Sequence, residues 1–100
     1  MEAIELTTQT QKYLQPEFEN VRSYYNKAYY TVDDDIVTLY SYNTKIATIS
    51  DERIKWITKD SKLLTNTTIR HLKEFIKQFT KLTDEKLTKN DLIKIANELS

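Results

Sequence analysis

His71 is the residue of this sequence whose type most readily does chemistry. It is the one histidine in 100 residues, and histidine is the side chain whose ordinary pKa lies nearest neutrality. Glu74 follows three residues later, a spacing that brings two side chains together on a helix and would suit a general base with a carboxylate beside it. The same spacing is typical of a structural histidine hydrogen-bonded to a sheet or loop, and we favour that interpretation. We therefore predict no catalytic residue.

Acidic residues cluster at two places that could be considered for metal binding. Asp33, Asp34 and Asp35 are consecutive, and Asp51 and Glu52 follow later. A hard cation needs several oxygens on a shaped loop, and the common calcium loop also needs a glycine. We interpret the acids as solvated turns that deter edge-to-edge strand pairing, and we expect no metal site.

Two residue types are missing from the chain. Without cysteine there is no disulfide and no thiolate chemistry. Without glycine there is no phosphate-binding loop of the dinucleotide or Walker type, and no G-x-S-x-G nucleophile turn. We therefore expect no cofactor and no enzymatic activity.

Tyrosine is abundant, with seven residues in the chain. This is more than a small core can bury with satisfied hydroxyls, and tyrosine is enriched at protein interfaces. Base stacking is a second use of such rings, and half-buried strand positions with wet hydroxyls are a third explanation. The predicted partner-binding residues are Tyr29, Tyr30, Asp33, Asp34, Asp35 and Tyr40.

The elements that position these residues follow from periodicity. Short aromatic and β-branched runs at 28–32, 36–42, 45–50 and 53–58 are separated by turns of two or three residues, which predicts an antiparallel meander of about four strands. Alternation places Leu39 and Tyr40 on opposite faces. In the last run it places Ile54 with Trp56, opposite Ile57.

Two helices are expected after the strands. The first is capped by Thr67 or Thr68, runs to about Thr80 and has an apolar face of isoleucine, leucine and phenylalanine. Thr88 to Asp91 has the form of a capping box for a last helix over 88–99. A short helix is expected over 17–26, and residues 1–20 are expected to be a weakly structured lead-in. The prediction is one α+β domain over 1–100, a meander packed against an amphipathic helix.

Charge is distributed unevenly along the sequence. Residues 1–52 carry nine acids and four bases, a net charge of −5, and residues 53–100 carry six acids and eleven bases, a net charge of +5. Such a molecule has an acidic and a basic part. The basic part includes a stripe on the first helix, which could contact nucleic acid or be a solvated face: Arg70, Lys73, Lys77 and Lys81.

Three segments together resemble a family pattern. Residues 24–29 (YYNKAY), 40–47 (YSYNTKIA) and 67–75 (TTIRHLKEF) look like the YGKAY…SYxTxIA…TTxRHxxEF pattern of small uncharacterised proteins from phages and mobile elements of Gram-positive bacteria. The resemblance covers about residues 24–80, and Asn26 stands where many relatives would have glycine. It implies a viral or mobile-element origin. Separately, we expect a cytoplasmic location in the bacterial host. We find no signal peptide or membrane segment in the sequence.

Two functions remain open at this point. The first is a non-catalytic module that binds a host protein and inhibits a defence nuclease, for example a CRISPR effector, in an anti-CRISPR manner. Its acidic surface would occupy the nucleic-acid groove by charge complementarity. The alternative is a nucleic-acid-binding accessory protein that uses the basic stripe. The sequence does not predict the oligomeric state.

Overall fold

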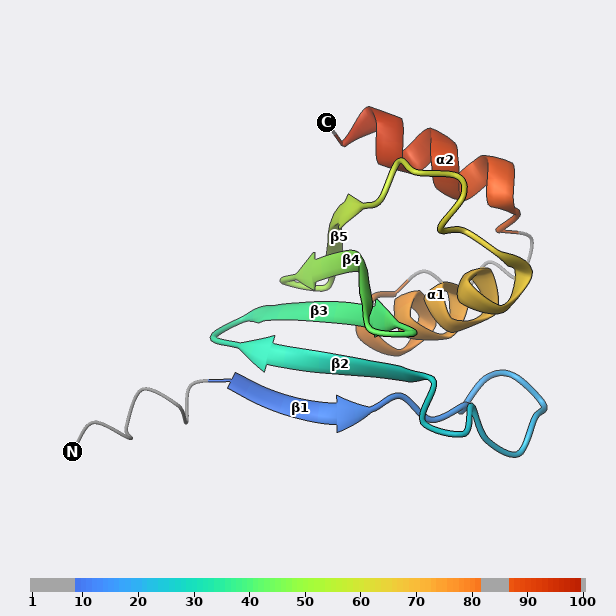
Figure 1. Cartoon of the computed structure of the whole chain (residues 1–100). Coiled ribbons are helices and arrows are strands. Elements are labelled where there is room, and N and C mark those ends of the chain that lie inside the picture. The colour runs from blue at the N-terminus through green and yellow to red at the C-terminus, as the bar shows by residue number, and fades with distance from the viewer. Residues whose placement is uncertain (1–8, 82–86, 100) are drawn as a thin grey trace.

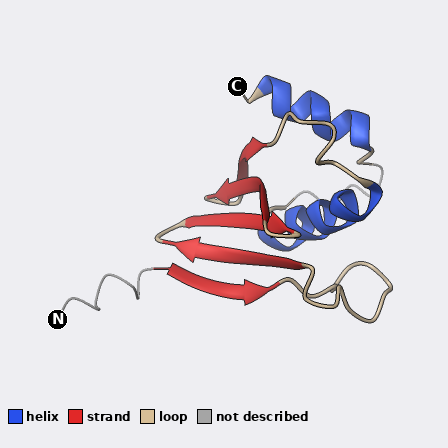
Figure 2. Ribbon diagram, viewed as in Figure 1, coloured by secondary structure: helices blue, strands red, loops and turns tan. Residues whose placement is uncertain are grey.

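One five-stranded antiparallel sheet forms the framework of the molecule, in strand order β1-β2-β3-β4-β5 (Figures 1 and 2). The structure, a computed structural model, describes residues 9–81 and 87–99. Two helices, α1 and α2, follow the sheet, which confirms the predicted α+β class. The strands are β1 (Gln9–Tyr13), β2 (Ala28–Asp33), β3 (Ile36–Ser41), β4 (Thr44–Ser50) and β5 (Arg53–Ile57).

The hairpin turns explain how a chain without glycine makes this meander. Two-residue turns that suit the twist of a hairpin need positive φ at one or both central positions. Tyr42 and Asn43 join β3 to β4 with φ of 52° and 66°, and Asp51 and Glu52 join β4 to β5 with φ of 56° and 60°. Asp34, between β2 and β3, has a φ of 58°. Asparagine and aspartate tolerate this geometry, whereas tyrosine and glutamate adopt it at a cost in strain.

The N-terminal part of the chain differs from the sequence prediction. Residues 9–13 form β1, which pairs along its whole length with β2, so the expected weak lead-in is wrong for these residues. The part of that prediction on 1–8 lies outside the described residues. No helix forms over 17–26; residues 14–27 are a long loop instead. The loop is held by contacts to α1, which lies more than fifty residues away in sequence.

Helix α1 (Asn66–Phe79) covers one face of the sheet, behind β3 and β4 in Figure 1. Its N-cap is Thr65, whose hydroxyl accepts a hydrogen bond from the Thr68 amide at 3.2 Å. The helix therefore begins slightly earlier than a Thr67 or Thr68 cap would allow. Leu72, Phe75 and Ile76 are fully buried against strand residues, and this apolar interface is the main source of stability.

Helix α2 (Lys89–Glu98) lies beyond the β5 edge and completes the same core. The predicted capping box is confirmed, because the Thr88 hydroxyl accepts from the Asp91 amide and the Asp91 carboxylate accepts from the Thr88 amide. Leu92 and Ala96 are buried in the cluster that α1 forms with the sheet. In the described part of the chain neither helix has the length and apolar character that crossing a bilayer requires.

Candidate functional site

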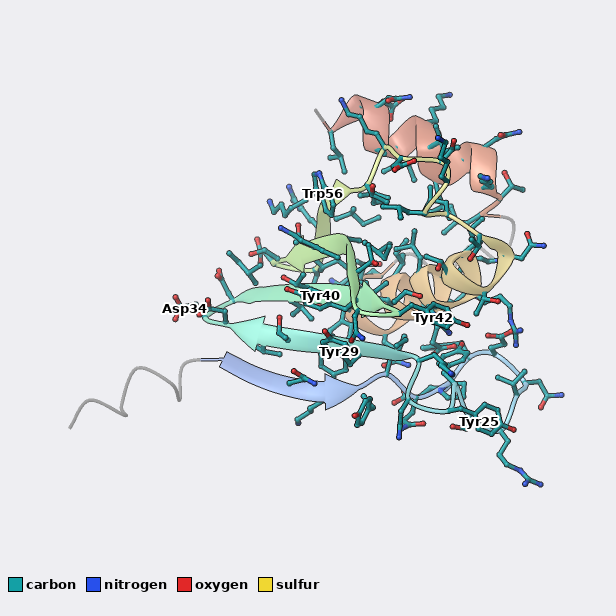
Figure 3. The ribbon with its side chains drawn as sticks, in the orientation of Figure 1. Tyr25, Tyr29, Asp34, Tyr40, Tyr42 and Trp56 are labelled. Atoms are coloured by element: carbon teal, nitrogen blue, oxygen red, sulfur yellow. The ribbon has the colours of Figure 1, made fainter. Side chains whose placement is uncertain are left out.

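The sheet has a second face that neither α1 nor α2 covers, and aromatic side chains occupy it (Figure 3). Leu39 is buried toward α1, so its neighbours Thr38 and Tyr40 point to the other face. Tyr29 lies directly opposite Tyr40 across β2 and β3. Their rings are stacked, with centroids 4.9 Å apart and planes 10° from parallel. This pair is the centre of what we call the open face.

Two further aromatic residues extend the open face toward the two edges of the sheet. Tyr13 of β1 pairs with Tyr29 and is 50% exposed. Trp56 of β5 pairs with Thr48, lies beneath the Lys45 ammonium at 5.1 Å, and is 37% exposed. The open face is thus defined by Tyr13, Tyr29, Tyr40 and Trp56, with Thr31, Thr38 and Thr48 between them.

Of the six predicted partner-binding residues, Tyr30 does not belong to this surface. It is the neighbour of Tyr29 and therefore faces α1, where its ring meets Phe79 edge-on at 4.9 Å. We correct the prediction accordingly: Tyr30 is a half-buried packing residue. Tyr13 and Trp56 belong to the open face instead, and the sequence-based prediction of partner-binding residues included neither of them. A bulge in β5 places Ile54 and Ile57 together against the core and leaves Trp56 outside, so the predicted grouping of Ile54 with Trp56 is wrong.

An acidic end adjoins the open face. The β2–β3 and β4–β5 turns lie at the same end of the sheet, at the left of Figure 1, because alternate hairpins of a meander turn at the same side. Asp34 marks this end in Figure 3. Five exposed carboxylates gather there: Asp33, Asp34, Asp35, Asp51 and Glu52. Asp33 shares the open face with Tyr29, because the two are four residues apart on β2, and Asp34 and Asp35 follow in the turn. Asp51 and Glu52 instead border a hollow with Lys81 and Ile95 on the helix side.

His71 is buried on α1 and hydrogen-bonded to the sheet, as the structural interpretation predicted. Its Nδ1 lies 2.9 Å from the Ser41 hydroxyl, and its ring meets Tyr24 edge-on at 4.7 Å. Burial, with a smaller effect of the Arg70 charge, lowers the pKa of His71 below its ordinary value. The ring is therefore neutral at physiological pH.

Glu74 has a structural role that the sequence did not predict. Its carboxylate is 2% exposed and accepts the backbone N–H groups of Glu17, Phe18 and Glu19 at 2.8 to 3.1 Å. The side-chain amide of Gln78 adds a fourth donor at 2.6 Å. With both oxygens engaged in this way, Glu74 does not serve as the carboxylate partner of His71, and the H-x-x-E spacing has no catalytic geometry.

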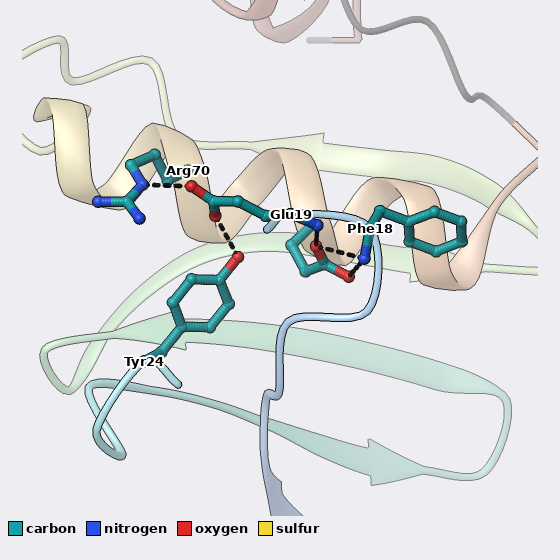
Figure 4. A network of polar contacts seen from close by, with 5 residues as sticks. Phe18, Glu19, Tyr24 and Arg70 are labelled. Carbon is teal, nitrogen blue, oxygen red and sulfur yellow. Dashed lines mark hydrogen bonds and ion pairs between the residues drawn. The ribbon is translucent and has the colours of Figure 1, made fainter. Parts of the chain in front are cut away.

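Glu19 links the same loop to α1 a second time (Figure 4). One carboxylate oxygen accepts from the Tyr24 hydroxyl at 2.5 Å and the other from Arg70 Nε at 2.6 Å. Burial acts to raise the pKa of Glu19, but the hydrogen bonds from Tyr24 and Arg70 outweigh it and hold that pKa below its ordinary value. Burial and the adjacent Glu19 carboxylate raise the pKa of the Tyr24 phenol well above its usual range.

These contacts interrupt the basic stripe of α1. Arg70 is paired with Glu19, and Lys81 lies 3.8 Å from Glu52. Lys73 and Lys77 border a small hollow of about 210 Å³ beside the docked 17–19 segment. Acidic side chains of the 14–27 loop and of the β4–β5 turn therefore interrupt the stripe, which is not a continuous cationic surface. Within residues 9–81 and 87–99, no group of three or more acidic or histidine side chains is placed to hold a metal ion.

The pH dependence of stability should report on the burial of His71. Because the pKa of His71 is lower in the folded state than the ordinary 6.5, the unfolded chain takes up a proton first as the pH falls. We expect the free energy of unfolding to fall by up to about 1.4 kcal/mol per pH unit below about pH 6.5. Urea unfolding at about pH 7.5 and about pH 5.5, followed by tryptophan fluorescence, measures this change.

His71→Gln is the matching control, since no other histidine titrates in that interval. Its stability should be nearly the same at the two pH values. The lowered pKa of Glu19 produces a separate loss of stability only at more acidic pH, below its ordinary value of 4.5. Equal pH dependence in the wild type and the variant would contradict a buried, neutral His71.

Comparison with known proteins gives one match. A family model, described as a family of unknown function (DUF8033), matches residues 12–94 and so spans β2 to β5, α1 and most of α2. No curated protein and no solved structure matches the chain. The match covers well over half of the sequence, and the chain therefore belongs to the DUF8033 family.

Proposed function

We propose that this protein is a non-catalytic binding module whose open face docks on another protein. The observation that carries the proposal is the stacked Tyr29–Tyr40 pair on a sheet face that no described helix covers. Tyrosine and tryptophan provide large contact area at low entropic cost and dominate binding energy at interfaces. Tyr13 and Trp56, both exposed, enlarge this area on either side.

The negative charge of the acidic end indicates that the partner's binding surface is positively charged. The three exposed carboxylates of Asp33, Asp34 and Asp35 at one end of the open face favour a partner that presents a basic groove beside an apolar patch, as proteins that bind nucleic acid do. Complementary charge would speed association, and the aromatic centre would slow dissociation. Inhibition of a nuclease would follow if the carboxylates occupied the groove in place of the nucleic acid. The sequence-based assignment to a CRISPR effector stays a prediction within this class.

Variants of the stacked pair test the proposal. We expect Tyr29→Thr combined with Tyr40→Thr, which keeps β-branched residues in the strands, to weaken binding of the partner at least about tenfold, because the rings supply the central contact. Tagged wild type and variant are compared by quantitative mass spectrometry of captured proteins, and the dissociation constant is then measured with the purified partner. Asp34→Asn with Asp35→Asn should instead slow association and reduce its dependence on salt.

Phe18→Ala is the control, because Phe18 is an exposed aromatic residue (54%) that lies on the loop and not on the open face. It should bind as the wild type does. Urea unfolding of every variant establishes that the fold is retained. Undiminished capture by the folded Tyr29→Thr, Tyr40→Thr protein would show that the open face is not the binding surface.

A further inference from the structure

A hollow of about 370 Å³ lies at the opposite end of the sheet from the acidic turns. Its walls come from the 21–27 part of the long loop, the β3–β4 turn and the first turns of α1. The lining includes Tyr25, Tyr42, Lys27, Arg70 and His71. Figure 3 shows Tyr25 and Tyr42 at this end of the molecule. The volume falls in the range of small-molecule sites.

Hydroxyl groups of α1 and the sheet occupy one ring nitrogen of His71. The Thr65 hydroxyl donates to Thr68 Oγ1 at 3.3 Å, Thr68 Oγ1 lies 3.1 Å from Ser41 Oγ, and Ser41 Oγ lies 2.9 Å from His71 Nδ1. We assign the tautomer in which the hydroxyl hydrogens run from Thr65 through Thr68 and Ser41 to Nδ1, so that Nε2 of the neutral ring is the N–H donor. His71 is 1% exposed, lines the hollow, and has no other hydrogen-bond partner among the described residues.

Cationic groups surround this donor. Arg70 uses Nε for its contact with Glu19, which leaves the terminal guanidinium nitrogens directed away from that carboxylate (Figure 4). Arg22 and Lys27 line the same hollow, and the Lys27 ammonium lies 5.8 Å from the centre of the Tyr42 ring. Glu19 is held by Arg70 and Tyr24 and is not among the lining residues. An anion would therefore meet three cationic side chains and one N–H donor.

The two tyrosines at the rim adopt costly backbone conformations. Tyr25 and Tyr42 have φ of 53° and 52°, and they are 73% and 52% exposed. A bulky residue with positive φ is unusual, and such strain clusters at functional sites. The other described residues with positive φ are asparagine, aspartate and Glu52, so the aromatic cases are confined to this hollow. Exposed rings beside cationic groups are the features that stack on planar bases.

From these observations we propose that the hollow binds a mononucleotide. The phosphate would be held by the Arg70 guanidinium and the His71 Nε2–H, with Arg22 and Lys27 adding positive charge. The base would stack on the ring of Tyr42 or Tyr25. This site is separate from the open face, so it stands or falls independently of the proposed protein-binding role.

Titration of the ¹⁵N-labelled protein with adenosine monophosphate tests the proposal. Chemical-shift changes should centre on residues 22–27, 42–43 and 67–71, and the His71 Nε2 resonance, assigned as the protonated nitrogen before addition, should shift. Adenosine alone and inorganic phosphate alone should each bind at least about tenfold more weakly, because each makes half of the contacts. Absence of saturable binding, or phosphate alone binding as tightly as the nucleotide, would overturn the assignment.

Tyr42→Asn separates a binding role from a structural one. Asparagine suits the left-handed position, so this variant should raise the urea midpoint while it weakens nucleotide binding about fivefold or more, the loss expected for a stacked base. Phe18→Ala, which removes an exposed aromatic side chain that does not line the hollow, should leave nucleotide affinity unchanged. Wild-type affinity in both Tyr42→Asn and Tyr25→Asn would contradict stacking on these rings.

Discussion

Replacing Glu74 with alanine is expected to lower the free energy of unfolding by about 2–4 kcal/mol, because three backbone N–H groups of the 17–19 segment and the Gln78 amide lose their buried acceptor. A single buried donor without a partner already costs on the order of 1–3 kcal/mol, and release of the loop into water limits the total. Urea unfolding followed by the fluorescence of Trp56 measures the change.

Hydrogen exchange distinguishes this mechanism from general destabilisation. In Glu74→Ala the amides of residues 17–19 should exchange far faster than those of β3 and β4, because the loop leaves α1 while the sheet stays paired. Glu98→Gln, an exposed glutamate on α2, should change stability by less than about 0.5 kcal/mol. A Glu74→Ala protein as stable as Glu98→Gln would show that the carboxylate does not hold the loop.

Phe75→Ala is expected to cost about 3–5 kcal/mol, the usual loss when a large aromatic side chain is removed from a closed core. Phe75 is fully buried in α1, contacts Phe79 at a ring separation of 5.2 Å, and packs in the cluster that joins the helix to the sheet. Stabilities of small domains are about 5–15 kcal/mol, so this change removes a large part of the total. Thermal or urea unfolding provides the measurement.

Phe18→Ala again provides a matched comparison, because it removes the same side chain from an exposed position. Its backbone N–H keeps the hydrogen bonds to Glu74. The expected change is within about 0.5 kcal/mol. Similar losses in the two variants would mean that the interface between α1 and the sheet is not the core.

The strands of the sheet were predictable from the sequence where alternating apolar and polar residues are bounded by residues that favour turns. Leu39 and Tyr40 face opposite sides as expected, and the Asp51–Glu52 turn joins β4 to β5. Strand β1 was missed because its glutamine- and threonine-rich sequence has no apolar face, and pairing with β2 stabilises it instead. The α1 helix and the capping box at Thr88 follow from local signals, and both are confirmed.

The site was less predictable because its geometry depends on contacts between distant residues. Tyr29 and Tyr30 are adjacent and differ only in the face they occupy, which alternation alone could have separated. The docking of residues 17–19 on Glu74 has no local signal, since the partners are at least 55 residues apart. The placement of Tyr25 and Tyr42 at one hollow likewise arises from the loop and the β3–β4 turn meeting in space.

Site-specific photo-cross-linking tests most directly whether the open face is the binding surface. A photoreactive amino acid is placed at Tyr13, Tyr40 or Trp56 on the open face, and at Lys73 on α1 or Asn90 on α2 as controls, in cells of the native source. The proposal predicts that the three open-face positions cross-link to the same protein and that the control positions do not. Cross-links to that protein from Lys73 or Asn90 but not from Tyr40, or none from the open face, would contradict it.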